Sequence, residues 1–181
     1  VIWVGTDDGN VQVTRDGGRS WKNVVDGAKV PANSWVAYID ASQHDAGSAY
    51  VAFDRHTNGE MGPMLYKVSD YGAKWTALAT PQQPKTVRGY AHVLREDPVK
   101  RGLLYAGTEL GLWISLDDGA HWAQFKGGDF PAVSVRDLVV QPRDHDLGQR
   151  VAAHIDALPE GGGAEDHGLR ALHQQPQQPA G

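Results

Sequence analysis

The sequence predicts an all-β fold built from repeated four-stranded antiparallel units. A short pattern, Asp-x-Gly-x-x-Trp, occurs three times, in TRDGGRSW, VSDYGAKW and SLDDGAHW. Its aspartates, Asp16, Asp70 and Asp117, recur at intervals close to the roughly 40–50 residues of one propeller blade. Short strand-like runs rich in Val, Tyr, Trp and Leu lie between the copies, and no segment before the C-terminal region has helical periodicity. We therefore predict a partial β-propeller of consecutive blades.

Composition narrows the function classes. The chain has 181 residues, a formal net charge of −5, 22 glycines, six tryptophans and no cysteine. The absence of a Lys/Arg cluster disfavours nucleic-acid binding. No apolar run approaches the roughly 18 residues of a membrane-spanning helix, and the lack of cysteine excludes disulfides and Cys-ligated zinc. We expect no cofactor.

The expected strands fill one part-blade, two whole blades and the start of another, all within a propeller segment covering 1–147. The part-blade 1–24 holds second, third and fourth strands at 2–6, 11–14 and 21–24. The blade 35–77 holds four strands at 36–40, 49–53, 64–69 and 75–77. The blade 90–125 holds four at 90–95, 103–108, 111–115 and 122–125, and a further first strand follows at 133–140.

The longer pattern [Ser/Thr]-x-Asp-x-Gly-x-x-Trp resembles the Asp-box, or bacterial neuraminidase repeat. This repeat occurs in sialidases, sortilin-type receptors, xyloglucan-degrading glycosidases and photosystem II assembly factors. Thr14 and Ser115 fill its first position, whereas Val68 departs from it. The wider text, WVGTDDGNVQVTRDGGRSW and YAGTELGLWISLDDG, is most similar to bacterial secreted proteins of the sortilin N-terminal type, often labelled glycosyl hydrolases. The resemblance covers residues 1 to about 147 and implies an extracellular or periplasmic location.

The residues of the repeat itself are interpreted as structural. The Asp carboxylate can accept hydrogen bonds from backbone N–H groups across the turn, Gly supplies a positive φ, and Trp packs back between sheets. No histidine or second carboxylate recurs beside them to serve as an acid/base partner. The set comprises Asp16, Gly18, Trp21, Asp70, Gly72, Trp75, Asp117, Gly119 and Trp122.

Ligand contacts are expected on the face opposite the Asp-box turns. Strands alternate in direction within a blade, so the second-to-third and fourth-to-first connections share that face, where propeller ligands usually sit. Second-to-third connections carry Asp7, Asp8, Asp54, Arg55, His56, Glu60 and Glu109, and fourth-to-first connections add Asp26, Lys85 and Arg88.

These acidic residues have two interpretations. A ring of carboxylates can bind a sugar or a cation, or act as an acid/base pair across a glycosidic bond. Similarity to the xyloglucanases at Gly-Thr-Asp-x-Gly implies that Asp7 is a catalytic carboxylate. The alternative is local turn chemistry, because Asp and Asn are frequent in hairpin turns. The pairs His44-Asp45 and His145-Asp146 lie on separate blades and make poor metal ligands, so no metal site is predicted.

Both ends of the sequence are atypical. The chain begins at Val1, which we interpret as a processed chain or a fragment. Residues 148–181 contain no aromatic side chain and end in a Gln/Pro-rich run, which predicts a disordered tail. One hypothesis is that the reading frame is broken there, and the coding DNA would test it. Another is that 151–155 pairs as a short second strand.

Three functions follow. The first is a catalytically incomplete propeller segment that presents a binding face to a carbohydrate or protein and belongs to a ring with further blades. The second is a fragment of a secreted, xyloglucanase- or sialidase-like glycoside hydrolase with Asp7 as one acid/base carboxylate. The third is an assembly factor with a protein partner and no small ligand. Because part of a ring leaves edge strands unpaired, we expect the isolated chain to be marginally stable or oligomeric.

Overall fold

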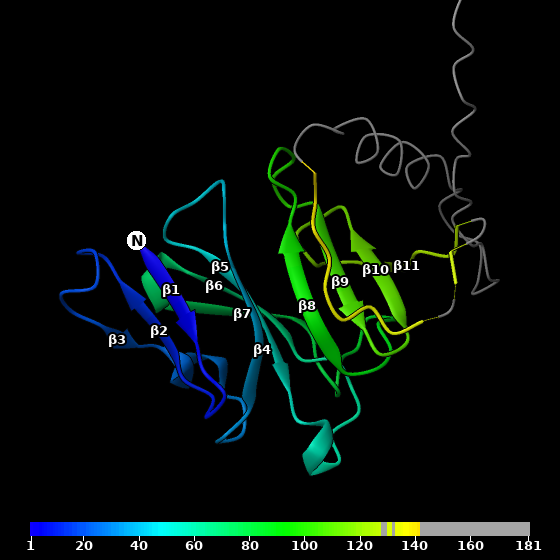
Figure 1. Ribbon diagram of the computed structural model, residues 1–181, viewed down its shortest axis with the longest axis horizontal. Helices are drawn as coiled ribbons and strands as arrows, with labels where there is room; N and C mark the ends of the chain where they lie inside the picture. The colour runs from blue at the N-terminus through cyan, green and yellow to red at the C-terminus, as the bar shows by residue number, and fades with distance from the viewer. Residues whose placement is uncertain (128–129, 132, 142–181) are drawn as a thin grey trace, which may run out of the picture.

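The computed structural model describes residues 1–127, 130–131 and 133–141, whose strands form three antiparallel sheets (Figure 1). The first sheet contains β1 (Ile2–Gly5), β2 (Val11–Thr14) and β3 (Lys22–Asn23). The second contains β4 (Trp35–Ala41), β5 (Ala49–Asp54), β6 (Leu65–Ser69) and β7 (Lys74–Ala79). The third contains β8 (Ala91–Glu96), β9 (Leu104–Thr108), β10 (Gly111–Ser115) and β11 (Ala123–Gln124).

Within each sheet the strands neighbour one another in chain order, so each sheet is a simple meander. Figure 1 shows the three sheets side by side, with β1 next to β4 and β4 next to β8. Three short 3-10 helices, η1 (Val25–Ala28), η2 (His56–Asn58) and η3 (Asp70–Gly72), lie in the connections. Across the described residues, no helix has the length and hydropathy that crossing a bilayer requires. The all-β, partial-propeller prediction is confirmed.

Apolar packing between successive sheets holds the blades together. One buried cluster joins the first and second sheets and includes Trp3, Val11, Val24, Phe53 and Val68. A second cluster joins the second and third sheets and includes Tyr50, Leu65, Leu78, Leu94, Leu104 and Trp122. Burial of these side chains is the main term that favours folding.

The first strands of both complete blades carry a β-bulge at the same place. In β4 the register shifts between Val36 and Tyr38, and in β8 it shifts between Ala91 and Val93. The extra residue is Ala37 in β4 and His92 in β8. A bulge bends the strand and re-aims one side chain, so His92 leaves the regular alternation.

The repeated glycine and tryptophan fasten each sheet to the sheet before it. Trp75 Nε1 donates to the carbonyl oxygen of Val24 at 3.0 Å, and Gly72 lies so close to Val24 that a Cβ would collide with it. Trp122 is only 6% exposed in the cluster that contains Leu78. We predicted the same packing for Trp21, and that was wrong: Trp21 is 43% exposed, because no sheet precedes the first one in the described residues.

The predicted strand at 133–140 also needs correction. The Val135 N–H donates to the Thr108 carbonyl at 2.9 Å, but these residues form no strand and pair with no strand among the described residues. A first strand pairs with the second strand of its own blade, and none follows in the part of the chain that the structure describes. The predicted tail at 148–181 and the strand at 151–155 lie outside the described residues.

Candidate functional site

The connections that follow the second strands place the predicted carboxylates at matching positions but in different surroundings. Asp54 is opposite Trp35 in the ladder, and the Glu109 N–H donates to the Tyr90 carbonyl at 3.1 Å. The side chain of Asp54 is 3% exposed and that of Glu109 is 35% exposed. Asp7 is exposed, and its carboxylate has no hydrogen-bond or ion-pair partner among the described residues.

Asp8 serves the turn between β1 and β2. Its carboxylate accepts hydrogen bonds from the Thr6 hydroxyl and, at 2.9 Å, from the Asn10 side-chain amide. The Thr6 hydrogen bond, followed by those from Asn10, lowers the pKa of Asp8. These bonds, with Gly9 at a φ of 91°, close the hairpin turn locally.

The Asp54 carboxylate positions His56. The His56 N–H donates to Asp54 at 2.8 Å, and the His56 Nδ1 lies 2.8 Å from both carboxylate oxygens. The imidazole then stacks on the ring of Tyr90, with centroids 4.4 Å apart and planes at 17°. Because Tyr90 precedes the next blade, this stack joins two blades across their boundary.

Glu109 holds the second histidine. His92 Nε2 lies 3.0 Å from Glu109 Oε2, which also accepts a hydrogen bond from the Ser134 hydroxyl at 2.8 Å. Hydrogen bonds from His92 and then Ser134 lower the pKa of Glu109. The His92 ring meets Tyr90 edge-on, with centroids 5.0 Å apart. Burial and then the negative charge of Glu109 raise the pKa of Tyr90.

Together these side chains form one polar group, which we name the blade-junction cluster. It runs from carboxylate to imidazole to phenol to imidazole to carboxylate, and comprises Asp54, His56, Tyr90, His92, Glu109 and Ser134. Three of its members were predicted as ligand contacts, namely Asp54, His56 and Glu109. Tyr90, His92 and Ser134 were missed, because all three fall inside predicted strands and their positions depend on a bulge and on packing between blades.

The other predicted contacts lie apart from this cluster. Arg55 Nη1 donates to the Ala32 carbonyl at 3.0 Å, and Glu60 accepts from the Gly62 N–H at 3.2 Å, so both stabilise loops. The expectation for Lys85 was wrong. Its Nζ donates to the Gly119 carbonyl at 2.9 Å, in the turn between β10 and β11, and the Thr86 hydroxyl next to it donates to the Trp122 carbonyl at 2.8 Å.

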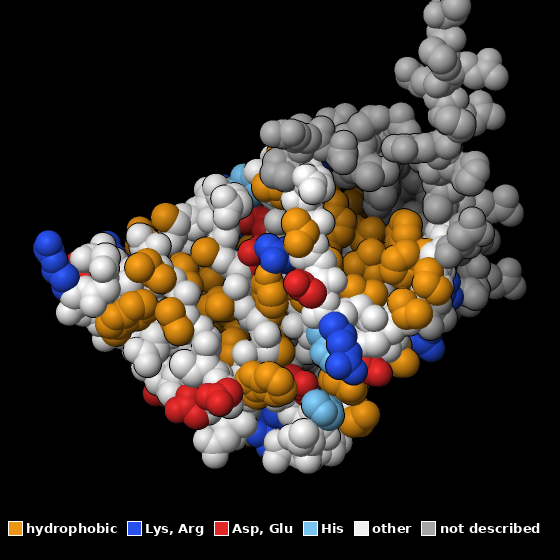
Figure 2. Space-filling view, in the orientation of Figure 1, with side chains coloured by type: hydrophobic (Ala, Val, Ile, Leu, Met, Phe, Trp, Pro, Cys, Tyr) orange, Lys and Arg blue, Asp and Glu red, His pale blue; other side chains and the backbone are white. Residues whose placement is uncertain are grey.

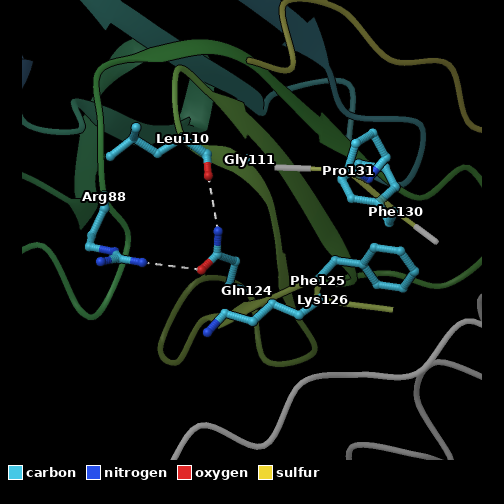
Figure 3. A pocket seen from close by; sticks show the side chains of 8 residues that line it. All are labelled: Arg88, Leu110, Gly111, Gln124, Phe125, Lys126, Phe130 and Pro131. Carbon is cyan, nitrogen blue, oxygen red and sulfur yellow. Dashed lines mark hydrogen bonds between the residues drawn. The ribbon is translucent and has the colours of Figure 1, made fainter. Parts of the chain in front are cut away.

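Two hollows open beside second-to-third turns. One, of about 420 Å³, lies between the turn at Leu110 and the residues after β11 (Figure 3). Its wall carries the edge-to-face pair Phe125–Phe130, and Gln124 links Arg88 at 3.4 Å to the Leu110 carbonyl at 3.0 Å. The other, of about 290 Å³, is lined by residues that include Asp8 and Asp26.

The Asp residues of the first and third repeat turns accept hydrogen bonds across the turn. Asp16 accepts from the Thr14 hydroxyl at 2.8 Å and the Ser20 N–H at 2.9 Å. Asp117 accepts from the Ser115 hydroxyl at 2.9 Å and the His121 N–H at 2.8 Å. These bonds occupy the carboxylates within their own turns.

The middle repeat turn differs. We expected the Asp70 carboxylate to accept in the same way, but it has no hydrogen-bond partner among the described residues. Val68 offers no hydroxyl there, and the chain instead turns through η3, with φ of 51° at both Asp70 and Tyr71.

The His44-Asp45 pair is also engaged locally. His44 Nε2 lies 2.9 Å from the Asp97 carbonyl, and Asp45 accepts from Gly47 at 3.0 Å and Ser48 at 2.6 Å. The described residues hold no group of three or more His, Asp or Glu side chains placed to bind a metal ion. His145-Asp146 lies outside the described residues.

Comparison with known proteins bears on the fold. No family model matches the chain, and no curated protein matches it. Among solved structures, it is similar to a GH74 enzyme from Niastella koreensis (17% identity, TM-score 0.50, covering 67% of this chain and 19% of that one). It is also similar to the GH74 xyloglucanase of Xanthomonas campestris (23%, 0.51, 70% and 19%) and to an ancestral GH74 enzyme (18%, 0.52, 70% and 17%). The chain thus spans about a fifth of the length of these glycoside hydrolases.

Proposed function

We propose that this chain is a segment of an Asp-box propeller whose blade-junction face binds carbohydrate. The observation that carries the proposal is the blade-junction cluster itself. It offers carboxylate acceptors, imidazole and hydroxyl groups side by side over two adjacent blades, with His56 35% exposed and Glu109 35% exposed. Saccharides present dense hydroxyl groups around flat apolar ring faces, and hydrogen-bonding groups beside aromatic rings match that chemistry.

The Asp-box turns have a structural role in this proposal. Their carboxylates are satisfied within the turn at Asp16 and Asp117, and the Trp75 and Trp122 rings contact the preceding sheet. Their role leaves the opposite face available for ligands. Because a fold does not by itself determine function, we assign carbohydrate binding to specific side chains, namely the blade-junction cluster and the two hollows beside it.

Titration with defined oligosaccharides tests this proposal. Calorimetry with a xyloglucan oligosaccharide, a cello-oligosaccharide and sialyllactose should give saturable binding for at least one of them. Tyr90→Ala removes the ring between the two histidines and should weaken that binding by roughly 10- to 100-fold. The matched control is Tyr71→Ala, which removes a half-exposed tyrosine from the opposite face and should leave binding unchanged.

A second candidate is that the segment belongs to a glycoside hydrolase, supported by its likeness to GH74 enzymes. Here Asp7 would be one acid/base carboxylate, and its exposed side chain leaves it open to a substrate. Glycoside hydrolysis needs a second carboxyl group at a defined separation. Reducing-sugar release from β-glucans, abolished by Asp7→Asn but kept by Asp8→Asn, would favour this candidate. Binding without hydrolysis favours the scaffold.

A role as a protein-binding scaffold predicts the opposite result in the same titrations. None of the sugars would then bind, and a pull-down would recover a protein whose retention depends on Tyr90. This outcome would reject the carbohydrate proposal while keeping the same face as the functional one.

A further inference from the structure

The two hollows beside the second-to-third turns occupy equivalent positions in the first and third sheets. Each lies between the turn that joins β1 to β2, or β9 to β10, and the residues that follow β3 or β11. In both sheets a side-chain amide two residues after the repeat tryptophan reaches from the last strand to that turn. Asn23 Nδ2 donates to Asn10 Oδ1 at 2.6 Å, and Gln124 Nε2 donates to the Leu110 carbonyl at 3.0 Å. The hollow is therefore a recurring feature of the blade.

The first hollow shows that this position stays open within a row of blades. The second sheet packs directly against the first, and the hollow of about 290 Å³ persists beside it. The second sheet also packs against the third, where the hollow of about 420 Å³ has the same place. Neither the blade that follows nor the blade that precedes therefore fills this position.

The linings of the two hollows carry opposite charge. Asp8 and Asp26 line the first, and no Lys or Arg lines it among the described residues. Arg88 and Lys126 line the second, whose described lining contains no Asp or Glu. Figure 2 shows acidic side chains gathered at the end of the first sheet where β1 turns into β2. In a chain with a formal net charge of −5, the hollow of the third sheet is a local reversal of sign that favours an anionic ligand.

Backbone contacts hold Arg88 at the rim of this hollow. The preceding residue, Val87, is 1% exposed, and the Arg88 carbonyl accepts from the Thr108 hydroxyl at 2.8 Å. Arg88 Nη2 lies 3.4 Å from Gln124 Oε1 (Figure 3), and Arg88 forms no ion pair with an acid among the described residues. The guanidinium has five N–H donors, so this one long contact leaves most of them for a ligand.

The other end of the hollow is aromatic. The rings of Phe125 and Phe130 meet edge to face, with centroids 5.2 Å apart, and both side chains are half-buried. Figure 3 places these rings at one end of the hollow and Arg88 at the other. Aromatic rings offer an apolar surface to a sugar ring, and a guanidinium binds a carboxylate through two parallel hydrogen bonds. The combination fits a saccharide that carries a carboxylate.

We propose that the hollow of the third sheet binds a uronic acid unit of an acidic saccharide, with the carboxylate on Arg88 and the sugar ring against Phe125 and Phe130. This inference rests on the proposed carbohydrate function and names its substrate class. The hollow adjoins the blade-junction cluster, because Arg88 precedes Tyr90 by two residues and Leu110 follows Glu109. A saccharide over the cluster thus places a neighbouring unit in the hollow, whereas the acidic hollow of the first sheet repels a carboxylate.

Calorimetry on the full chain with two matched oligosaccharides tests this proposal. Cellotetraose is neutral, and its C6-oxidised form, cellotetraouronate, differs only in carrying carboxylates in place of hydroxymethyl groups. The acidic sugar should bind at least about 10-fold more tightly in low-salt buffer. This advantage should shrink as the ionic strength rises, because salt screens the attraction between the carboxylate and the guanidinium.

Variants of Arg88 locate the effect. Arg88→Met should lower the affinity for cellotetraouronate about 10-fold and leave that for cellotetraose unchanged. Arg88→Lys keeps the charge but loses the paired donors, so it should recover part of the lost affinity. Arg101→Met is the matched control, because it removes the same charge from an exposed residue in the turn between β8 and β9, on the opposite face. It should change neither affinity by more than about two-fold.

Tyr90→Ala separates this inference from the proposed function on which it rests. It should weaken the binding of both sugars alike, because Tyr90 belongs to the cluster and not to the lining of the hollow. Equal affinities for the two sugars, or an acidic preference that survives Arg88→Met, would overturn the assignment to acidic saccharides and leave carbohydrate binding in place. If neither sugar binds, the assignment is wrong, and the xyloglucan and sialyllactose titrations then decide whether the proposed function stands.

Discussion

Tyr50 and Tyr105 provide a matched test of how blades are held together. They occupy the same register position, Tyr50 opposite Asp40 in the second sheet and Tyr105 opposite Arg95 in the third. Tyr50 is 1% exposed, and its hydroxyl bridges to the third blade, 2.7 Å from Asp118 and 3.1 Å from Glu96. Burial and these carboxylates raise the pKa of Tyr50 well above its ordinary value.

Tyr105 makes a weaker contact. Its hydroxyl reaches Asp97 of its own blade at 3.4 Å, and its side chain is only half-buried. The substitution Tyr50→Phe should therefore cost more stability than Tyr105→Phe, although both remove one hydroxyl from the same position of a blade.

The magnitude follows from what the carboxylates retain. Without the Tyr50 hydroxyl, Glu96 keeps hydrogen bonds from Ser42 and, at 3.2 Å, from the Gly102 N–H, and Asp118 keeps its ion pair with Lys67. Neither acid is left alone, so the loss is one hydrogen bond to a charged group. We expect Tyr50→Phe to lower the free energy of unfolding by about 2 kcal/mol and Tyr105→Phe by less than about 1 kcal/mol.

Urea unfolding at pH 7 and one fixed protein concentration, followed by tryptophan fluorescence, measures both variants. The denaturant midpoint should fall without a change in the m-value, because the surface exposed on unfolding is unchanged. Equal losses for the two variants, or no loss for Tyr50→Phe, would refute the bridging role of the Tyr50 hydroxyl.

Three further predictions concern packing, titration and backbone. Trp75→Ala removes a half-buried ring and its hydrogen bond to the preceding sheet, and should cost about 3 kcal/mol in urea unfolding. The pKa of Glu109 is lowered from 4.5, chiefly by its hydrogen bond to His92. The ionised Glu109 side chain thus stabilises the fold fully above pH 4.5, and this stabilisation is lost as the pH falls through the lowered pKa. A carboxyl NMR titration should show the midpoint rising toward 4.5 in His92→Ala. Gly72→Ala, at φ 95° and against a neighbouring side chain, should lower Tm clearly more than Gly17→Ala, at φ 74° with open space around it.

The repeat made most of the fold predictable. Because Asp-x-Gly-x-x-Trp recurs at blade intervals, it located the turn between the third and fourth strands in every blade. The other strands were then predicted from the short runs of Val, Tyr, Trp and Leu between the repeats. Two strands, β2 and β10, have the predicted bounds, and the others begin or end within a few residues of them. The prediction of a strand at 133–140 was wrong because a β-strand needs a neighbouring strand to pair with, and the composition of a segment does not show whether such a neighbour is present.

The site was predictable only in part. Asp54 and Glu109 were predicted as ligand contacts because they follow second strands at equivalent positions, and His56 because it lies in the long loop after Asp54. Tyr90 and His92 were hidden inside a predicted strand, and their roles depend on the bulge in β8 and on stacking across two blades. One local signal could have pointed to them. Tyr90 and His92 lie on either side of Ala91, at the start of a strand that follows a polar loop.

The central proposal is that the blade-junction face binds carbohydrate. NMR spectra of the chain titrated with a xyloglucan oligosaccharide test it most directly. We expect the signals of His56, Tyr90 and His92 to shift together and saturably, while those of Tyr71 and the Trp21 indole stay fixed. Shifts confined to the repeat turns, or no saturable shift at His56, Tyr90 and His92, would contradict it.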